Sequence, residues 1–177
     1  MKLAMIGFGQ AGGKILDRFL KYDSSRGTGI IGHAIAVNSA KADLMGLDYV
    51  PNENRVLIGQ SVVKGHGAGT EPDLGEKCAR EDLEEIQSAI DKMVSSEIDA
   101  FLIIAGLGGG TGSGGSPILA DHLQRLYVEP IYGLGILPSR DEGGIYNRNA
   151  ARSFQTFAES VDNLLVFDND AFKTGGE

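Results

Sequence analysis

A run of glycines that follows a strand-like apolar segment constrains this 177-residue chain more than any other feature. The glycines begin at Gly106, and the apolar residues 101–104 come just before them. Glycines let backbone N–H groups approach an anion closely, and the N-terminus of a following helix adds favourable partial charge. A strand, a glycine loop and a helix in this order therefore predict a binding loop for a phosphate group.

Short apolar runs alternate with amphipathic segments along the whole chain. We expect strands at residues 3–6, 30–37, 56–58, 98–105, 131–137 and 164–167, and helices after Gly13, at 40–47, from Thr70 onward, at 117–127 and at 150–160. This order predicts an α/β, Rossmann-like fold: a mostly parallel sheet with helices on both faces. Ligands bind such sheets at the carboxyl ends of the strands, where the glycine loops would meet.

The segment after residue 70 predicts one long helix. Thr70 and Asp73 have the spacing of a capping box, and Pro72 suits a first helical turn. Apolar residues then recur every three or four positions and form one stripe: Ala79, Leu83, Ile86, Ile90 and Met93. Cys78 lies within this pattern, so we expect a buried, reduced thiol.

Composition excludes several classes of protein. The net charge is −8 without a basic cluster, which argues against a nucleic-acid partner. The single cysteine permits neither an internal disulfide nor a cysteine metal cluster. No apolar run reaches the ~20 residues of a transmembrane segment, and no signal peptide precedes the first expected strand. We therefore expect a cytoplasmic protein.

Another glycine loop, the first loop in chain order, lies near the N-terminus. Gly7-Phe8-Gly9-Gln10-Ala11-Gly12 matches the G-x-G-x-x-G motif of dinucleotide-binding folds. Those folds place an acidic residue at the end of the second strand, where it accepts hydrogen bonds from both ribose hydroxyls. Asn38 stands there instead, and an amide cannot accept both bonds in that way. An NAD(P)-binding oxidoreductase domain is thus kept only as the alternative.

The same loop does not form a Walker P-loop, although Gly13-Lys14 is suggestive. That motif requires Gly at the position of Phe8 and Ser or Thr at the position of Ile15. Lys14 is therefore not assigned the catalytic role of a Walker lysine.

The run Gly108-Gly109-Gly110-Thr111-Gly112-Ser113-Gly114 matches G-G-G-T-G-[ST]-G at every position. This is the signature of the tubulin/FtsZ family, which the chain resembles along its whole length. Residues 9–13 resemble the family's first phosphate loop, and residues 65–69 with Pro72 resemble its γ-phosphate-sensing loop. The first fourteen residues and Tyr146-Asn147-Arg148-Asn149 are most similar to CetZ, the archaeal branch.

The resemblance implies that the chain binds GTP or GDP together with Mg²⁺. Glu142 resembles the ribose-binding acid of the family, and Asn169 resembles the residue that reads the guanine base. By position alone, Glu142 would be a solvated loop carboxylate and Asn169 a turn residue. His66 either titrates near bound nucleotide or has a structural or solvent role. The residues expected to contact nucleotide are Gly9, Gln10, Ala11, Gly12, Gly13, Lys14, Asn38, Gly69, Gly108, Gly109, Gly110, Thr111, Gly112, Ser113, Glu142 and Asn169.

The resemblance also implies head-to-tail self-association into filaments, with GTP hydrolysed at the subunit junction. In the family, acidic residues on a loop of the neighbouring subunit position the attacking water, and that loop lies beyond a long core helix. The chain ends at Glu177, so we expect residues 1–177 to be the GTP-binding domain, without the core helix, the C-terminal domain or any catalytic residue. The resemblance thus implies a cytoskeletal GTPase concerned with cell shape, of which this domain binds nucleotide with negligible turnover.

Overall fold

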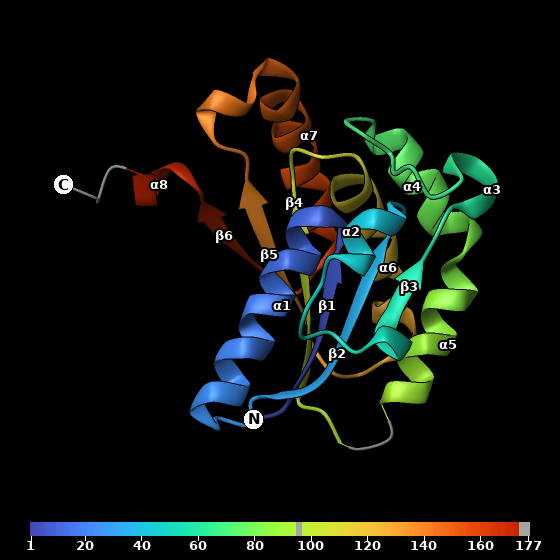
Figure 1. Cartoon of the computed structure of the whole chain (residues 1–177), viewed down its shortest axis with the longest axis vertical. Coiled ribbons are helices and arrows are strands. Elements are labelled where there is room, and N and C mark those ends of the chain that lie inside the picture. The colour runs from blue at the N-terminus through green and yellow to red at the C-terminus, as the bar shows by residue number, and fades with distance from the viewer. Residues whose placement is uncertain (95–96, 174–177) are drawn as a thin grey trace.

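The chain forms a six-stranded sheet in which every neighbouring pair of strands is parallel (Figure 1). The computed structural model describes residues 1–94 and 97–173, so the chain end at residues 174–177 lies outside the described residues. The strands lie in the order β3-β2-β1-β4-β5-β6. They are β1 (Leu3–Phe8), β2 (Ile31–Asn38), β3 (Arg55–Leu57), β4 (Ala100–Gly106), β5 (Ile131–Leu137) and β6 (Asn163–Asp168). The predicted α/β fold class is confirmed.

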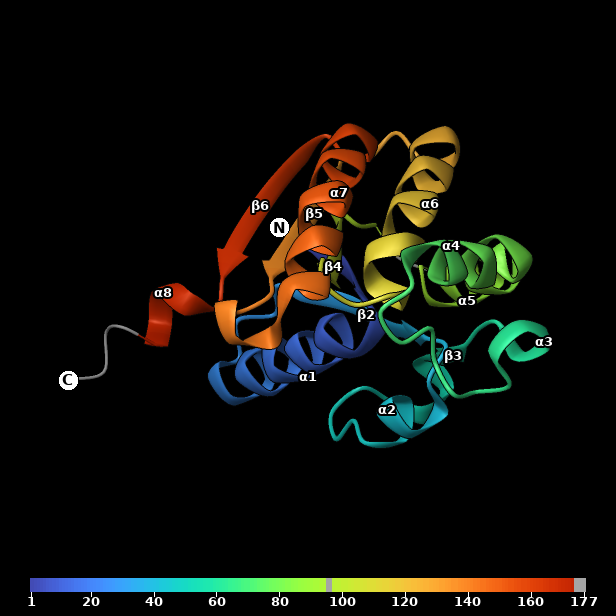
Figure 2. The ribbon, with the colours of Figure 1, turned by 90° about the horizontal axis from the view of Figure 1, so that it is seen from above.

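Helices cover both faces of the sheet, as predicted. Figure 2 shows α1 and α2 on one face and α4 to α7 on the other. The helices are α1 (Gly9–Arg26), α2 (Lys41–Met45), α3 (Gln60–Val63), α4 (Pro72–Glu81), α5 (Leu83–Met93), α6 (Thr111–Leu126), α7 (Gly144–Ser160) and α8 (Asp170–Lys173). None of the helices in the described residues is long and apolar enough to cross a lipid bilayer.

The side chains of β1 alternate between two core layers. Ala4, Ile6 and Phe8 pack in the layer shared with α4 to α7, whereas Met5 packs with Leu16 of α1 on the other face. Complete burial of an Ile, Leu or Phe side chain contributes about 1.5–3 kcal/mol. These two layers therefore stabilise the sheet, and the sheet in turn fixes the positions from which the loops at its carboxyl edge begin.

Central and edge strands differ in their burial. In β4, every residue from Ala100 to Ala105 is buried, as a strand covered by helices on both faces should be. The edge strand β6 instead exposes the apolar side chains of Leu165 and Val166.

The single long helix predicted after residue 70 is wrong, because the segment divides into α4 and α5 at Asp82. The Asp82 carboxylate accepts a hydrogen bond from the backbone N–H of Gly59 at 2.6 Å, and its backbone leaves the helical region. Short polar side chains that bond to backbone elsewhere compete with helix in this way. The predicted capping box is also absent: Glu71 is the N-cap of α4, without a side-chain cap bond, and Pro72 is the first helical residue.

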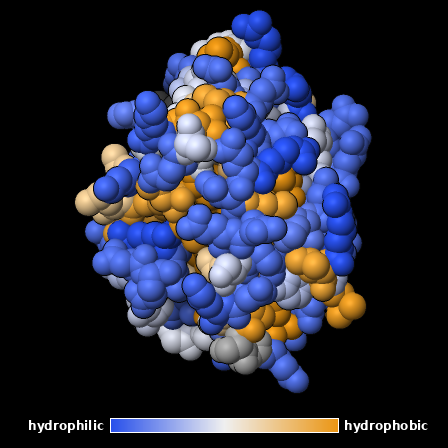
Figure 3. All heavy atoms as spheres, turned by 90° about the vertical axis from the view of Figure 1, so that its right-hand side faces the viewer, coloured by the Kyte–Doolittle hydropathy of each residue, from blue (hydrophilic) through white to orange (hydrophobic). Residues whose placement is uncertain are grey.

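The apolar stripe and the buried thiol of this segment are confirmed. Ala79, Ile86 and Ile90 are completely buried, and Cys78 is a free, buried cysteine. Burial, with the nearby carboxylates, raises the pKa of the Cys78 thiol. Off the stripe, Glu81, Glu84, Glu85 and Asp91 are exposed, whereas Asp82 is half-buried. Figure 3 shows a largely hydrophilic surface with scattered apolar patches on this side of the molecule.

The helix predicted at 117–127 begins six residues earlier, at Thr111, and contains Pro117. Glycines in its first turns allow close packing. A Cβ at Gly114 would lie 1.9 Å from the Pro72 carbonyl oxygen, and one at Gly115 would lie 2.3 Å from the Phe8 ring. This packing outweighs the low helix propensity of glycine and proline. Similarly, α7 begins at Gly144 rather than at residue 150.

Candidate nucleotide-binding site

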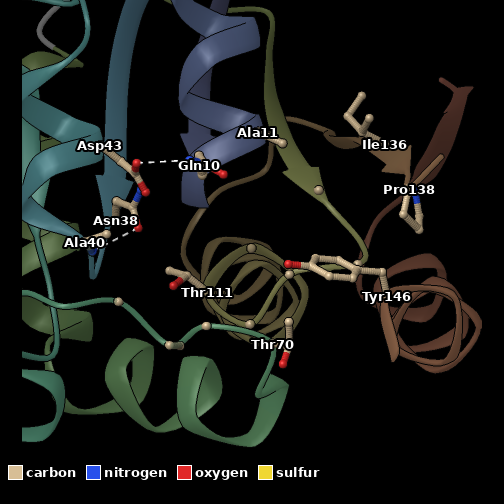
Figure 4. Close-up of a pocket in the computed structure, with 18 of the residues that line it drawn as sticks. Gln10, Ala11, Asn38, Ala40, Asp43, Thr70, Thr111, Ile136, Pro138 and Tyr146 are labelled. Atoms are coloured by element: carbon tan, nitrogen blue, oxygen red, sulfur yellow. Dashed lines mark hydrogen bonds between the residues drawn. The ribbon is translucent and has the colours of Figure 1, made fainter. Parts of the chain in front are cut away.

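A cavity of about 340 Å³ opens at the carboxyl edge of the sheet (Figure 4). It is lined by residues that follow β1, β2, β4, β5 and β6, and by the loop at residues 66–70. The prediction that the glycine loops meet at this edge is therefore confirmed. Parallel strands produce this arrangement because all of their carboxyl ends lie on the same side.

The structure brings most of the predicted contact residues together around this cavity. Those that line it are Gln10, Ala11, Asn38, Gly69, Gly108, Gly109, Gly110, Thr111, Gly112, Glu142 and Asn169. The predicted residues outside the lining are Gly9, Gly12, Gly13, Lys14 and Ser113. The Lys14 side chain is exposed to solvent.

Glycines of the first loop pack α1 against its neighbours. A Cβ at Gly12 would lie 2.1 Å from the carbonyl oxygen of Ile104, and one at Gly9 would lie 2.8 Å from the backbone nitrogen of Gly112. Gly9 also has a φ of 76°, which L side chains rarely adopt. These contacts bring the N-termini of α1 and α6 together, and both present unpaired N–H groups suited to an anion.

The second glycine loop, at residues 106–114, is held by hydrogen bonds to two other segments of the chain. The Gly110 N–H donates to the Gly69 carbonyl at 2.8 Å. Asn149 of α7 donates through Nδ2 to the carbonyls of Gly108 and Thr70, at 3.0 and 2.8 Å. The loop is thereby fixed to α7 and to the loop at residues 66–70, although Asn149 itself was predicted only as part of a motif.

The two hydroxyls of this loop have different surroundings. The Ser113 hydroxyl donates to the carbonyls of Gly109 and Gly110, so it stabilises the loop itself. The Thr111 hydroxyl lies 2.7 Å from the buried hydroxyl of Ser39, and Thr111 lines the cavity. Thr111 is therefore the one of the two placed to meet a ligand.

One end of the cavity contains a polar cluster centred on Asp43 of α2 (Figure 4). Its carboxylate accepts hydrogen bonds from Nε2 of Gln10 at 3.1 Å and from Nδ2 of Asn38 at 3.4 Å. Oδ1 of Asn38 accepts from the Ala40 N–H at 3.1 Å. Sequence reasoning missed Asp43, since no motif marks it and only the fold of α2 over the end of β2 places it here.

The opposite end combines apolar and polar groups. Ile136, Pro138 and Tyr146 line this part, and Figure 4 shows them across the cavity from Asp43. Glu142 lies in a short 3₁₀ helix (Arg140–Glu142), where its carboxylate accepts from the Ser139 N–H at 2.9 Å in a capping box. The carboxylate is therefore held in place by the capping box, although Glu142 is exposed to solvent. Tyr146 belongs to a quoted motif but was not predicted as a contact.

The lining contains two carboxylates, those of Asp43 and Glu142, and no Lys or Arg among the residues that the structure describes. Attraction for an anion must therefore come from backbone N–H groups and the two helix N-termini. His66 lines the cavity with a solvent-exposed side chain. In the described ranges, no group of three or more His, Cys, Asp and Glu side chains is placed to bind a metal.

Comparisons with known proteins agree with this geometry. The model of the Tubulin/FtsZ family, GTPase domain, matches residues 2–175. Tubulin-like protein CetZ1 of Haloferax volcanii is 66% identical over all 177 residues, which cover 45% of that protein, and CetZ3 of the same organism is 59% identical, with 46% of it covered. The chain thus spans about half the length of these relatives.

Solved structures give the same result. The GDP-bound CetZ1 monomer of Haloferax volcanii superposes with a TM-score of 0.96 at 66% identity, covering 100% of this chain and 54% of that one. The GTPγS-bound CetZ2 protofilament from the same organism gives 0.93 at 47% identity, covering 100% and 52%. None of these comparisons supports the oxidoreductase alternative. The chain belongs to the tubulin/FtsZ family and matches its GTPase domain along almost its whole length.

Proposed function

We propose that this chain is the guanine-nucleotide-binding domain of a CetZ-like cytoskeletal protein. The observation that supports the proposal is the cavity, whose lining includes residues 108–112 of the glycine motif, Glu142 and Asn169, beside the N-termini of α1 and α6. The relatives support it, because one solved CetZ holds GDP and another holds GTPγS in a protofilament.

Within this proposal, the two ends of the cavity take different parts of the nucleotide. Glu142 accepts hydrogen bonds from the ribose hydroxyls, and Asn169 reads the base with both a donor and an acceptor. Thr111 and the backbone N–H groups of the glycine loop hold the phosphates. Gly9 and Gly12 support these contacts by packing, and Ser113 supports them by hydrogen bonds within the loop.

Mg²⁺ is the metal that fits the residues present. It prefers oxygen ligands, keeps several waters, and commonly uses one or two carboxylates together with substrate phosphates. Asp43 and the side-chain oxygen of Gln10 supply such oxygens at one end of the cavity. When bound there with a nucleotide, Mg²⁺ would neutralise part of the phosphate charge.

Filament assembly and hydrolysis belong to the whole protein, of which this chain spans about half of what its relatives contain. We propose that full-length subunits assemble head to tail in the cytoplasm and hydrolyse GTP at their junction, in a role that controls cell shape. The CetZ2 protofilament supports self-association. The chain's own part is to bind the nucleotide that each junction encloses, without turning it over alone.

Binding of GTP, GDP and NADH to the purified chain tests the proposal. We expect saturable binding of both guanine nucleotides at one site, no binding of NADH, and GTP turnover at the level of the buffer control. Binding of NADH without binding of guanine nucleotide would reverse the assignment. Turnover that survives repeated purification would show that the chain holds its own catalytic group.

A further inference from the structure

The cavity would take a polyphosphate without the help of a basic side chain in its described lining. A nucleoside triphosphate brings about four negative charges, yet the described lining contains carboxylates and no basic side chain. Glu142 is held by the Ser139 N–H at the end that carries Tyr146 and Asn169. Asp43 lies at the other end, so its charge faces a different part of the bound nucleotide than Glu142 does.

The position of Asp43 along the cavity identifies that neighbour. If Glu142 and Asn169 hold the nucleoside, the phosphates extend across Thr111 toward Asn38 and Asp43 (Figure 4). The last phosphate of the chain then lies closest to the Asp43 carboxylate. A diphosphate is one phosphate shorter and ends farther from it.

Asp43 also fixes which way the Gln10 amide points. A carboxylate only accepts hydrogen bonds, so the amide group 3.1 Å away must face it with Nε2. The Gln10 side-chain oxygen is then on the cavity side, as Figure 4 shows. Two hydrogen-bond acceptors, this oxygen and the Asp43 carboxylate, thus stand where a terminal phosphate would arrive.

Acceptors and phosphate oxygens repel one another unless a cation or a donor lies between them. The cation that joins hard oxygens of this kind is a divalent metal ion such as Mg²⁺. We propose that Asp43 makes tight binding of the triphosphate depend on a divalent cation, through its own charge and through its hold on Gln10, while the diphosphate depends on the cation much less. The inference rests on the proposed guanine-nucleotide site.

The test compares the dissociation constants of GTP and GDP in Mg²⁺ and in EDTA, for wild type and variants. For wild type we expect GTP affinity to fall at least about tenfold in EDTA, the size of one unit-charge repulsion in a partly solvated site. GDP affinity should fall less than about threefold, since its last phosphate lies farther from Asp43.

Asp43→Asn removes the charge and lets residue 43 donate, so the Gln10 amide is free to reverse. We expect GTP to bind this variant more tightly than it binds wild type in EDTA. The ratio of its GTP dissociation constants in EDTA and in Mg²⁺ should therefore fall below about threefold. Asp43→Glu keeps the charge and should restore the wild-type ratio. Asp48→Asn is the matched control, because it removes the same charge from an exposed residue outside the cavity lining.

Each outcome decides the matter. A ratio for Asp43→Asn equal to that of wild type overturns the proposal, and so does a wild-type GTP ratio near one. If Asp43→Asn does not melt cooperatively, two other measurements still test the proposal. They are the wild-type difference between GTP and GDP in EDTA and the ratio measured for Asp43→Glu. A chain that binds neither nucleotide in either buffer refutes the proposed function itself, whereas normal binding with an unchanged ratio refutes only the role of Asp43.

Discussion

The two glycine loops look alike in sequence but serve different purposes in the structure. In the first loop, Gly7 and Gly12 face backbone atoms, with the carbonyl oxygens of Gly12 and Ile104 only 2.5 and 2.1 Å from their would-be Cβ positions. In the second loop, Gly109 lines the cavity, and a Cβ there would meet nothing within 4 Å. The first loop thus uses glycine for helix packing. The second loop also contains packing glycines, since a Cβ at Gly110 would lie 2.6 Å from the Ala68 carbonyl oxygen, but it adds Gly109, where glycine leaves room for a ligand.

The largest expected effect is a loss of stability at Gly12, where helix packing requires glycine. Gly12→Ala should lower the free energy of unfolding by about 3 kcal/mol or more, because its methyl group would collide with a strand carbonyl that cannot move. Urea unfolding measures this change. Gly13→Ala in the same helix is the control, since its Cβ would only touch Leu47 at 3.8 Å. Similar stability of the two variants would remove the packing role of Gly12.

A second, smaller effect concerns ligand access at Gly109. Gly109→Ala should leave the melting temperature unchanged, because the added methyl group has no close neighbour. It should reduce GTP affinity about tenfold, or about 1.4 kcal/mol, by occupying space beside the phosphates. Calorimetric titration and a melting curve on the same sample check both parts. Lost stability with unchanged affinity would place Gly109 with the packing glycines instead.

A third test concerns the side chain that fixes the second loop from outside. Asn149→Ala removes two hydrogen bonds and leaves the carbonyls of Gly108 and Thr70 without this donor, which should cost about 1–2 kcal/mol of stability. GTP binding should weaken in parallel, as the loop loses its position. Asn147→Ala, at an exposed position of the same helix, is the comparison. Equal unfolding midpoints for the two variants would contradict this role.

The smallest expected effect concerns α6 and α1, the helices that follow the two loops, and how a group on each changes stability at low pH. Burial lowers the pKa of His122 on α6, so the unfolded chain takes up this proton more readily than the folded one. Stability should therefore fall as the pH drops from 7 to 5, and His122→Gln should reduce that loss. On α1, the Thr28 hydroxyl lowers the pKa of Asp23, so any loss from this group begins only near pH 4. Urea unfolding at pH 7, 6 and 5 follows the difference.

Periodicity and spacing predicted the parallel sheet and the meeting of the loops, because hydrophobic alternation and parallel connections are local properties of sequence. The starts of helices were predicted less well. α6 begins at Thr111 because its glycines pack against Pro72 and Phe8, and contacts between distant segments leave no local pattern. The break at Asp82 has the same origin, in a hydrogen bond to Gly59.

In the candidate site, too, residues within a motif were predicted and residues placed by distant packing were not. Glu142, Asn169 and the glycine motif were identified through the resemblance to a family, and the cavity is lined by Glu142, Asn169 and residues 108–112 of the motif. Asp43 was missed because it lies on a five-residue helix whose position depends on the packing of Leu44 and Leu47 under the sheet. A residue that acts on other side chains, rather than within a motif, is visible only in three dimensions.

The hydrogen bonds of the Asn149 amide bear on the order in which the chain folds during its synthesis. It joins carbonyls that lie 79 and 41 residues earlier in the chain, at Thr70 and Gly108. Contacts of such long range form late, because the intervening chain must first be ordered. During synthesis, the first five strands and the whole glycine motif are made before α7 emerges. The nascent chain therefore holds its whole glycine motif for some time before Asn149 can fix that motif to α7.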